Sequence, residues 1–86
     1  MAEKFPIYLE IINGHSIYEV LSPIEMKEIQ TIGKKYVQHH LVAKIYPEKV
    51  LISDMINNEG GRWARLSVDD YQKKLEQIRS KLERLV

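Results

Sequence analysis

The clearest pattern of apolar positions lies in the last twenty residues of the chain. Apolar side chains recur there at spacings of three and four residues, at Val68, Tyr71, Leu75, Ile78, Leu82 and Leu85. Side chains at this spacing share one face of a helix. Ser67 is a suitable N-cap, and Asp70 stands in the position that completes a capping box. The pattern predicts a C-terminal helix whose apolar face must be covered by the chain's own sheet or by another protein.

The flanks of this stripe favour packing on the chain's own sheet over a coiled coil. Read as heptads, the stripe is flanked by Gln72, Lys74, Arg79 and Lys81, and none of these is acidic. In a homodimeric coiled coil the cations would face one another, where opposite charges normally select the partner. The stripe also spans fewer than three heptads, which is short for a coiled coil.

A β-hairpin is predicted around Asn13-Gly14. Residues 5–12 and 17–21 are rich in β-branched and aromatic side chains, and an intervening Asn-Gly pair is typical of a two-residue turn. This turn fixes the register of the two strands. It places Ile7, Leu9 and Ile11 beside Val20, Tyr18 and Ser16 on one face, and sets Glu10 opposite Ile17 and Tyr8 opposite Glu19 on the other.

The next segment has the sequence features of a helix start. Ser22 is a suitable cap, Pro23 fits the first turn, and Glu25 can close a capping box. A glycine with no Cβ suits a left-handed helix end, and Gly33 follows eight residues later. We therefore predict a helix from about residue 22 to residue 32.

Alternation indicates strands in the segment that follows. Residues 36–46 alternate between two faces, Pro47-Glu48 turns the chain, and residues 50–56 return as a strand. Residues 57–61 form a loop, and residues 62–65 form a short fifth strand. The expected fold is α+β, with an antiparallel sheet of four or five strands, two helices on one face, and two layers in the order ββαββ(β)α.

Composition limits the class of protein. Eighty-six residues, 44% apolar and 29% charged, suffice for one compact domain spanning residues 1–86. There is no cysteine, which suits a reducing compartment and excludes a disulfide framework. No stretch is apolar enough to cross a membrane or to act as a signal segment, so a cytoplasmic location is expected.

The net charge of +1 is unevenly distributed. Residues 1–33 hold two lysines against five glutamates, whereas residues 34–66 hold six cationic residues against three acids. Such a division either makes a dipolar surface for a partner or brings two patches together within the fold.

No catalytic, metal or cofactor site is predicted. His39 and His40 point to opposite faces of a strand, so they cannot bind one metal together without a ligand from another element. Depending on the register at Pro47, one of them would lie near Asp54 on the neighbouring predicted strand. No nucleophile accompanies such a pair, so we expect no enzymatic activity.

Two surfaces are candidates for binding. The basic and aromatic segment 34–65 resembles in composition the surfaces that hold single-stranded nucleic acid, through Lys44, Tyr46, Arg62, Trp63 and Arg65. Within that segment Gly60-Gly61 is interpreted as a flexible loop, because it lacks the spacing of a phosphate-binding motif. The second candidate is a sheet face left without helices, which would carry Tyr8, Ile12, Ile17, Tyr36, Val42 and Tyr46.

The sequence thus favours a non-enzymatic module that binds a protein partner, or its own copy as a homodimer, through its sheet. The alternative is binding of single-stranded nucleic acid.

Overall fold

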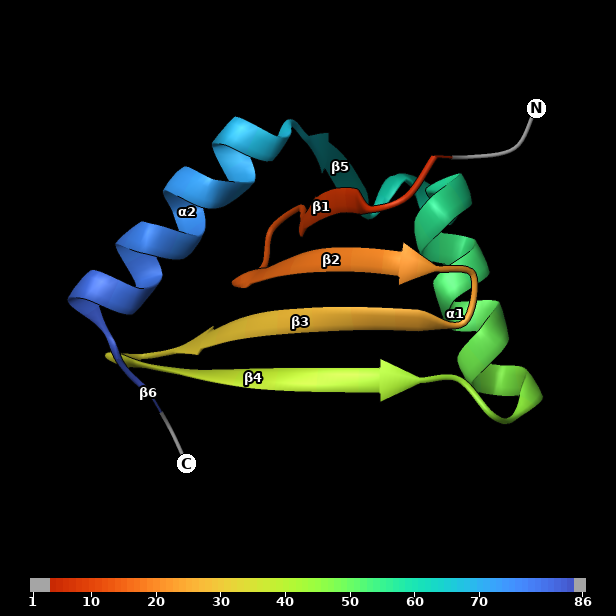
Figure 1. The fold of residues 1–86 in the computed structure, drawn as a ribbon, viewed down its shortest axis with the longest axis horizontal. Coiled ribbons are helices and arrows are strands. Elements are labelled where there is room, and N and C mark those ends of the chain that lie inside the picture. The colour runs from red at the N-terminus through yellow and green to blue at the C-terminus, as the bar shows by residue number, and fades with distance from the viewer. Residues whose placement is uncertain (1–3, 85–86) are drawn as a thin grey trace.

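The sheet is the centre of the structure. The computed structural model describes residues 4–84, apart from the side chain of residue 59, and contains a mixed six-stranded sheet and two helices (Figure 1). The elements in chain order are β1 (Ile7–Ile11), β2 (Ser16–Ser22), β3 (Glu25–Ile32), β4 (Lys35–Val42), α1 (Tyr46–Asn57), the 3-10 helix η1 (Glu59–Gly61), β5 (Trp63–Leu66), α2 (Val68–Lys81) and β6 (Glu83–Arg84).

The strands lie in the order β5-β1-β2-β3-β4-β6. Every neighbouring pair is antiparallel except β4 and β6, which are parallel. The predicted α+β class and the mainly antiparallel sheet are therefore confirmed. The sheet is wider than predicted because β3 replaces an expected helix and β6 joins at one edge.

The first hairpin forms in the predicted register. Leu9 pairs with Tyr18, and Glu10 pairs with Ile17, so the turn consists of Asn13 and Gly14. Asn13 takes a positive φ of 61°, which asparagine tolerates better than most residues. A Cβ at Gly14 would lie 2.5 Å from Cγ2 of Ile11. Glycine is thus required at the second turn position by a close approach.

The helix predicted over residues 22–32 is wrong, because this segment forms β3. Ser22 does not cap a helix; its Oγ accepts a hydrogen bond from the Ile24 N–H at 3.2 Å and closes the turn between β2 and β3. Gly33 does adopt a positive φ of 62°, but in the turn between β3 and β4. Residues of β3 pair on both sides, with β2 and with β4, and this long-range pairing overrides the local capping signal.

The strand predicted over residues 50–56 is also wrong, because this segment lies within α1. Pro47 does not turn the chain but occupies the first turn of the helix, where a missing N–H costs nothing. Ile52 and Met55 are buried and Ile56 packs against them, a three-and-four spacing that fits a helix. The order is therefore ββββαβαβ, and not the predicted ββαββ(β)α.

The two helices cover opposite faces of the sheet. Adjacent residues of a strand point to opposite faces, and both Ile17 and Tyr18 of β2 are buried. Tyr18 belongs to the cluster packed by α1 through Ile52 and Met55. Ile17 belongs to the cluster packed by α2 through Tyr71, with the half-buried Leu75, Ile78 and Leu82 against it. The expectation that both helices share one face is thus corrected.

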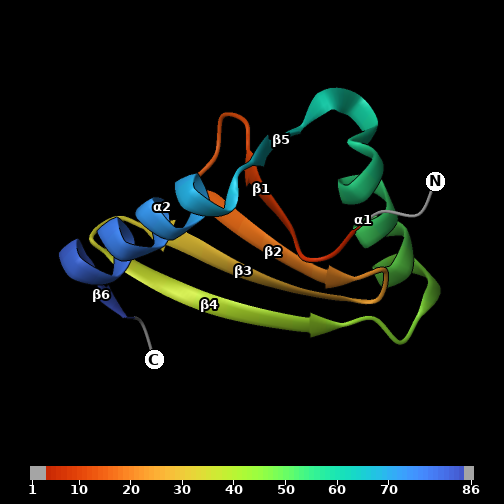
Figure 2. The ribbon, with the colours of Figure 1, turned by 45° about the horizontal axis from the view of Figure 1, so that its top comes forward.

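The helices also lie at opposite ends of the strands. α2 crosses the end at which β3 turns into β4, and α1 lies at the end at which β2 turns into β3 (Figures 1 and 2). Each end of the sheet is therefore covered by one helix, and the two helices lie on opposite faces. α1 begins after the end of β4, and α2 ends before β6, which pairs with the start of β4.

The C-terminal helix follows its sequence pattern. The Asp70 N–H donates to the Ser67 Oγ at 3.1 Å, which confirms Ser67 as the cap. The apolar stripe packs on the chain's own sheet, as predicted, except that Val68 is exposed. Leu85, the last predicted member of the stripe, lies outside the described residues. No helix within residues 4–84 is long and apolar enough to span a membrane.

The assignment of α1 predicts different effects for two neighbouring residues. Ile52 is 0% exposed and Leu51 is 39% exposed. Ile52→Ala should lower the free energy of unfolding by about 2–5 kcal/mol, because it leaves a cavity under the sheet. Leu51→Ala should lower it by less than about 1 kcal/mol. Urea unfolding monitored by circular dichroism measures both values. Equal losses would contradict the different burial of these two side chains on α1.

Candidate functional site

The outer edge of β4 is open along most of its length. All eight residues of β4 pair with β3 on the inner side. On the outer side, β6 pairs only with Lys35 and Tyr36. No other strand in the described part of the chain pairs with residues 37–42. An unpaired strand edge presents a row of backbone donors and acceptors to solvent.

Two hydrogen bonds show which backbone groups of β4 face outward. The Ala43 N–H donates to the Ile24 carbonyl at 2.6 Å, toward the β3 side. The Lys34 carbonyl accepts from the Glu83 N–H at 3.2 Å, on the β6 side. Backbone groups alternate in direction along an antiparallel strand. The N–H and C=O groups of Gln38, His40 and Val42 therefore point outward, and they bond to no described residue.

The opposite edge of the sheet is better protected. β5 has only four residues. The Ile12 N–H donates to the Arg62 carbonyl at 2.8 Å, so even-numbered residues face β1 and the Trp63 N–H faces outward. That N–H donates to Oδ1 of Asn58 at 3.0 Å. Short edges and covering side chains are common ways of blocking strand addition. The β4 edge therefore stands out as the accessible one.

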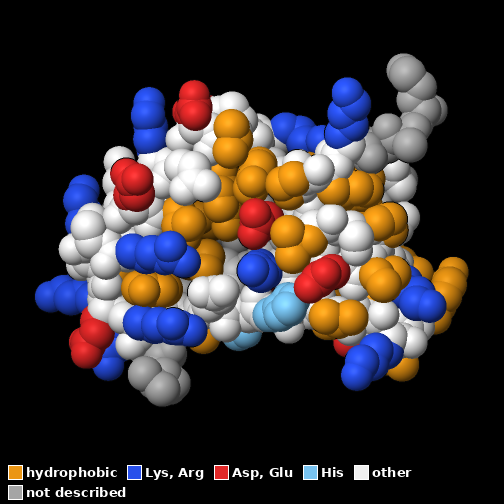
Figure 3. Space-filling view, in the orientation of Figure 1, with side chains coloured by type: hydrophobic (Ala, Val, Ile, Leu, Met, Phe, Trp, Pro, Cys, Tyr) orange, Lys and Arg blue, Asp and Glu red, His pale blue; other side chains and the backbone are white. Residues whose placement is uncertain are grey.

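An apolar corner adjoins the open edge where β4 ends. We define it as Ile24, Val42, Ile45 and Tyr46, whose exposed fractions are 48%, 44%, 59% and 78%. The hydrogen bond from Ala43 to Ile24 joins the β2–β3 turn to the end of β4, and α1 starts three residues later. Apolar and basic side chains gather at the right of Figure 3, over the end of the sheet where α1 lies.

The open edge is bordered by cations. Residues 34–44 include three lysines and two histidines and no acid. Lys44 and Lys49 are exposed beside the apolar corner. The nearby Glu48 carboxylate is already engaged, because it accepts the N–H groups of Lys44 and Ile45 at 2.9 and 3.2 Å. These hydrogen bonds lower the pKa of Glu48 and hold its charge at the start of α1.

The structure separates the six residues proposed as a sheet interface. Ile17 and Tyr36 are buried under α2. Tyr8 packs in the same cluster, with its ring centroid 4.5 Å from that of Tyr71. The remaining three residues, Ile12, Val42 and Tyr46, are exposed, and only Val42 and Tyr46 belong to the apolar corner.

Burial raises the pKa of two tyrosines in the core. Burial, followed by the charge of Glu19, raises the pKa of Tyr71 to about 12. Burial and the Glu28 carboxylate raise the pKa of Tyr18. These hydroxyls therefore keep their protons at neutral pH. They serve the packing of the two clusters.

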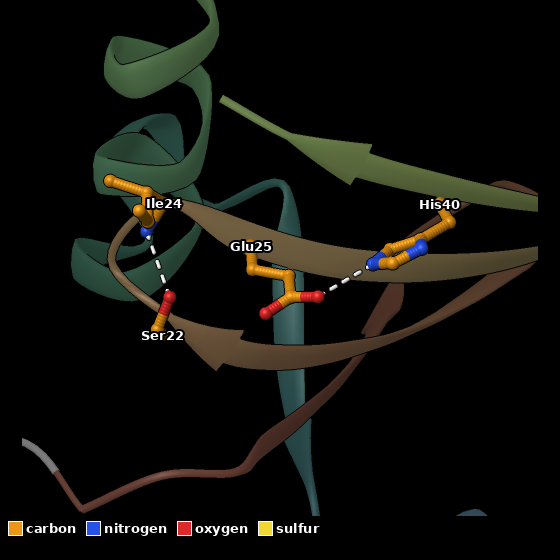
Figure 4. Close-up of polar contacts among 4 residues, drawn as sticks. All are labelled: Ser22, Ile24, Glu25 and His40. Carbon is orange, nitrogen blue, oxygen red and sulfur yellow. Dashed lines mark hydrogen bonds and ion pairs between the residues drawn. The ribbon is translucent and has the colours of Figure 1, made fainter. Parts of the chain in front are cut away.

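The part of the α2 face that α2 leaves uncovered is polar. Glu19 pairs in register with Lys27, and Lys27 pairs with His40, so polar and charged side chains cross β2, β3 and β4 in a row. Acidic, basic and histidine side chains lie together in the middle of Figure 3. His40 Nε2 also lies 2.7 Å from Oε2 of Glu25, its diagonal neighbour on β3 (Figure 4). A solvated row of this kind makes the sheet edge a better candidate than the sheet face.

The five candidate nucleic-acid residues fall into two groups. Lys44 and Tyr46 are exposed at the start of α1. Arg62, Trp63 and Arg65 follow its end, about 18 Å away for a 12-residue helix. Trp63 is buried, with the Arg62 guanidinium 4.5 Å from its ring centroid. The indole is therefore not exposed for stacking on a base.

The histidines and Asp54 do not form the predicted pair. Asp54 lies on α1, whereas His39 lies 3.3 Å from Gln30 Oε1 and His40 contacts Glu25. Their partners on β3 show that the two histidines do point to opposite faces, as predicted. Among the described residues, no three histidine, aspartate or glutamate side chains converge to bind a metal.

A small cleft lies between α2 and the β1–β2 turn. Its volume is about 240 Å³, and Glu10, His15, Lys74 and Gln77 contribute to its lining. Lys74 Nζ is 3.2 Å from Oε2 of Glu10, so the two charges compensate each other. The cleft is smaller than the usual range of small-molecule sites, roughly 300–1,000 Å³. It therefore ranks below the β4 edge.

Comparison of the chain with protein-family models, curated proteins and solved structures finds no match.

Proline substitutions at two adjacent residues test the direction of the β4 backbone. His40→Pro removes an outward N–H, so it should unfold at nearly the same urea concentration as His40→Ala. His39→Pro removes an N–H that donates to β3. Its free energy of unfolding should therefore be about 1–3 kcal/mol lower than that of His39→Ala. Each alanine variant controls for loss of the imidazole. Equal proline effects at both positions would contradict the assigned direction.

Proposed function

We propose that this chain is a non-enzymatic interaction module that binds an extended segment of a partner protein along β4. The observation that carries the proposal is the outward row of backbone groups at Gln38, His40 and Val42. A peptide strand placed beside them would satisfy donors and acceptors that now face solvent. The lack of cysteine suits action in the cytoplasm, where thiols stay reduced.

The surroundings of the edge support strand addition. Residues 37–42 offer roughly 20 Å of strand, enough for a peptide of about six residues. The edge has no proline and no bulge between β3 and β4, two features that commonly block pairing. At the end of this edge, the apolar corner offers a surface for one or two apolar side chains of the partner. Backbone pairing would supply affinity, and the corner would supply selectivity.

Selection from a random dodecapeptide library, displayed on phage, tests strand addition whatever the identity of the partner. Selected peptides should bind the wild-type chain and the His40→Ala variant with similar Kd. Binding to His40→Pro should weaken at least about tenfold, because proline removes one hydrogen bond and its ring blocks the edge. Fluorescence anisotropy with synthetic copies of the selected peptides measures these Kd values.

Two results would contradict the proposal. One is a selection that yields no peptide above background; the other is a set of peptides that bind His40→Pro as tightly as the wild-type chain. A pool of mixed single-stranded oligonucleotides belongs in the same assay. Salt-sensitive binding of that pool, unaffected by His40→Pro, would favour the nucleic-acid alternative.

A further inference from the structure

We infer that the segment bound along β4 is acidic and carries apolar residues near its end, an inference that rests on the proposed function. The apolar corner and the open edge form one continuous surface, since Val42 belongs to both. A strand paired with residues 37–42 extends past Val42 and reaches Ile45 and Tyr46. The side chains there determine what the end of the bound segment must be.

The charges around this surface select for acids. Lys44 and Lys49 are exposed beside the corner, and Lys34 and Lys35 are exposed at the other end of β4. The two acids nearest the corner are engaged, Glu25 with His40 and Glu48 with backbone N–H groups. At the other end, Glu83 of β6 is the acid that pairs in register with Lys35. Four lysines thus stand against three acids around this surface, and residues 34–44 themselves hold no acid, so the flanks of a bound segment would be acidic.

The same charges disfavour a second copy of the chain as the occupant. Residues 34–44 contain no acid, so a second copy paired through its own β4 brings further lysines to this surface and no carboxylate. The pairing of β6 with Lys35 and Tyr36 also keeps a second strand away from the start of β4. A partner with acidic flanks gains an attraction that a second copy does not.

Two synthetic peptides that differ only in flanking charge test the inference. Both carry the central sequence Leu-Thr-Val-Thr-Val-Leu; one has two glutamates at each end, and the other has two lysines at each end. The symmetric flanks make the result independent of strand direction. At low salt the wild-type chain should bind the glutamate peptide at least about tenfold more tightly, and rising salt should reduce the difference.

Variants locate the source of the preference. The double substitution Lys44→Glu and Lys49→Glu should abolish or reverse the preference for glutamate. Lys73 and Lys81 on α2 serve as matched controls, because both are exposed and lie outside the apolar corner and the open edge. Their replacement by glutamate changes the net charge equally and should leave most of the preference in place.

The outcomes separate this inference from the proposed function. If both peptides bind the wild-type chain equally and neither binds His40→Pro, strand addition stands and the acidic preference is wrong. If the glutamate peptide binds His40→Pro as tightly as the wild-type chain, its attraction is not to the β4 edge, and the inference fails. If neither peptide binds at millimolar concentration, both proposals fail. A wild-type dimer in light scattering that His40→Pro converts to a monomer would identify a second copy as the occupant.

Discussion

Burial of both faces of the sheet is the constraint on which the rest of the structure depends. Ile17 and Tyr18 are adjacent in β2, and each lies in a different apolar cluster. A single helical layer cannot cover both residues, so α1 packs on one face and α2 on the other. This division explains why Tyr8 packs against Tyr71 on one face and why Met55 packs among residues of β1 and β2 on the other. Covering the two faces of the sheet therefore uses both helices.

The open edge follows from this use of the helices. α1 leaves the end of β4 and crosses to β5, and α2 returns from β5 to the start of β4. Neither helix lies along the outer side of β4, and β6 reaches only Lys35 and Tyr36. At the opposite edge, by contrast, β5 is short and the outward Trp63 N–H donates to Asn58 Oδ1. Both helices are used to close the core, so the outward backbone groups of β4 remain accessible.

The sequence predicted local features well where local chemistry decided them. Asn13-Gly14 set the register of the first hairpin, and Ser67 with the stripe from Tyr71 to Leu82 set the last helix. It failed where distant pairing decided. Ser22 and Pro23 fit the start of a helix, but the segment that follows stays extended because it then pairs with both β2 and β4. After Pro47 the apolar residues Val50, Leu51 and Ile52 are consecutive and the run is short, so the strand interpretation competed with the helical spacing of Ile52, Met55 and Ile56.

The second failure is also what concealed the candidate site. A strand at residues 50–56 would have paired with the strand before it, so the sequence alone placed β4 inside the sheet. Once that segment is a helix, the acid-free stretch from Lys34 to Lys44 becomes an edge. Amide hydrogen exchange of the free protein, resolved by NMR, tests this central claim most directly. The His39 and Leu41 amides should exchange at least about tenfold more slowly than the His40 and Val42 amides. Uniform protection across these four residues would contradict an open β4 edge.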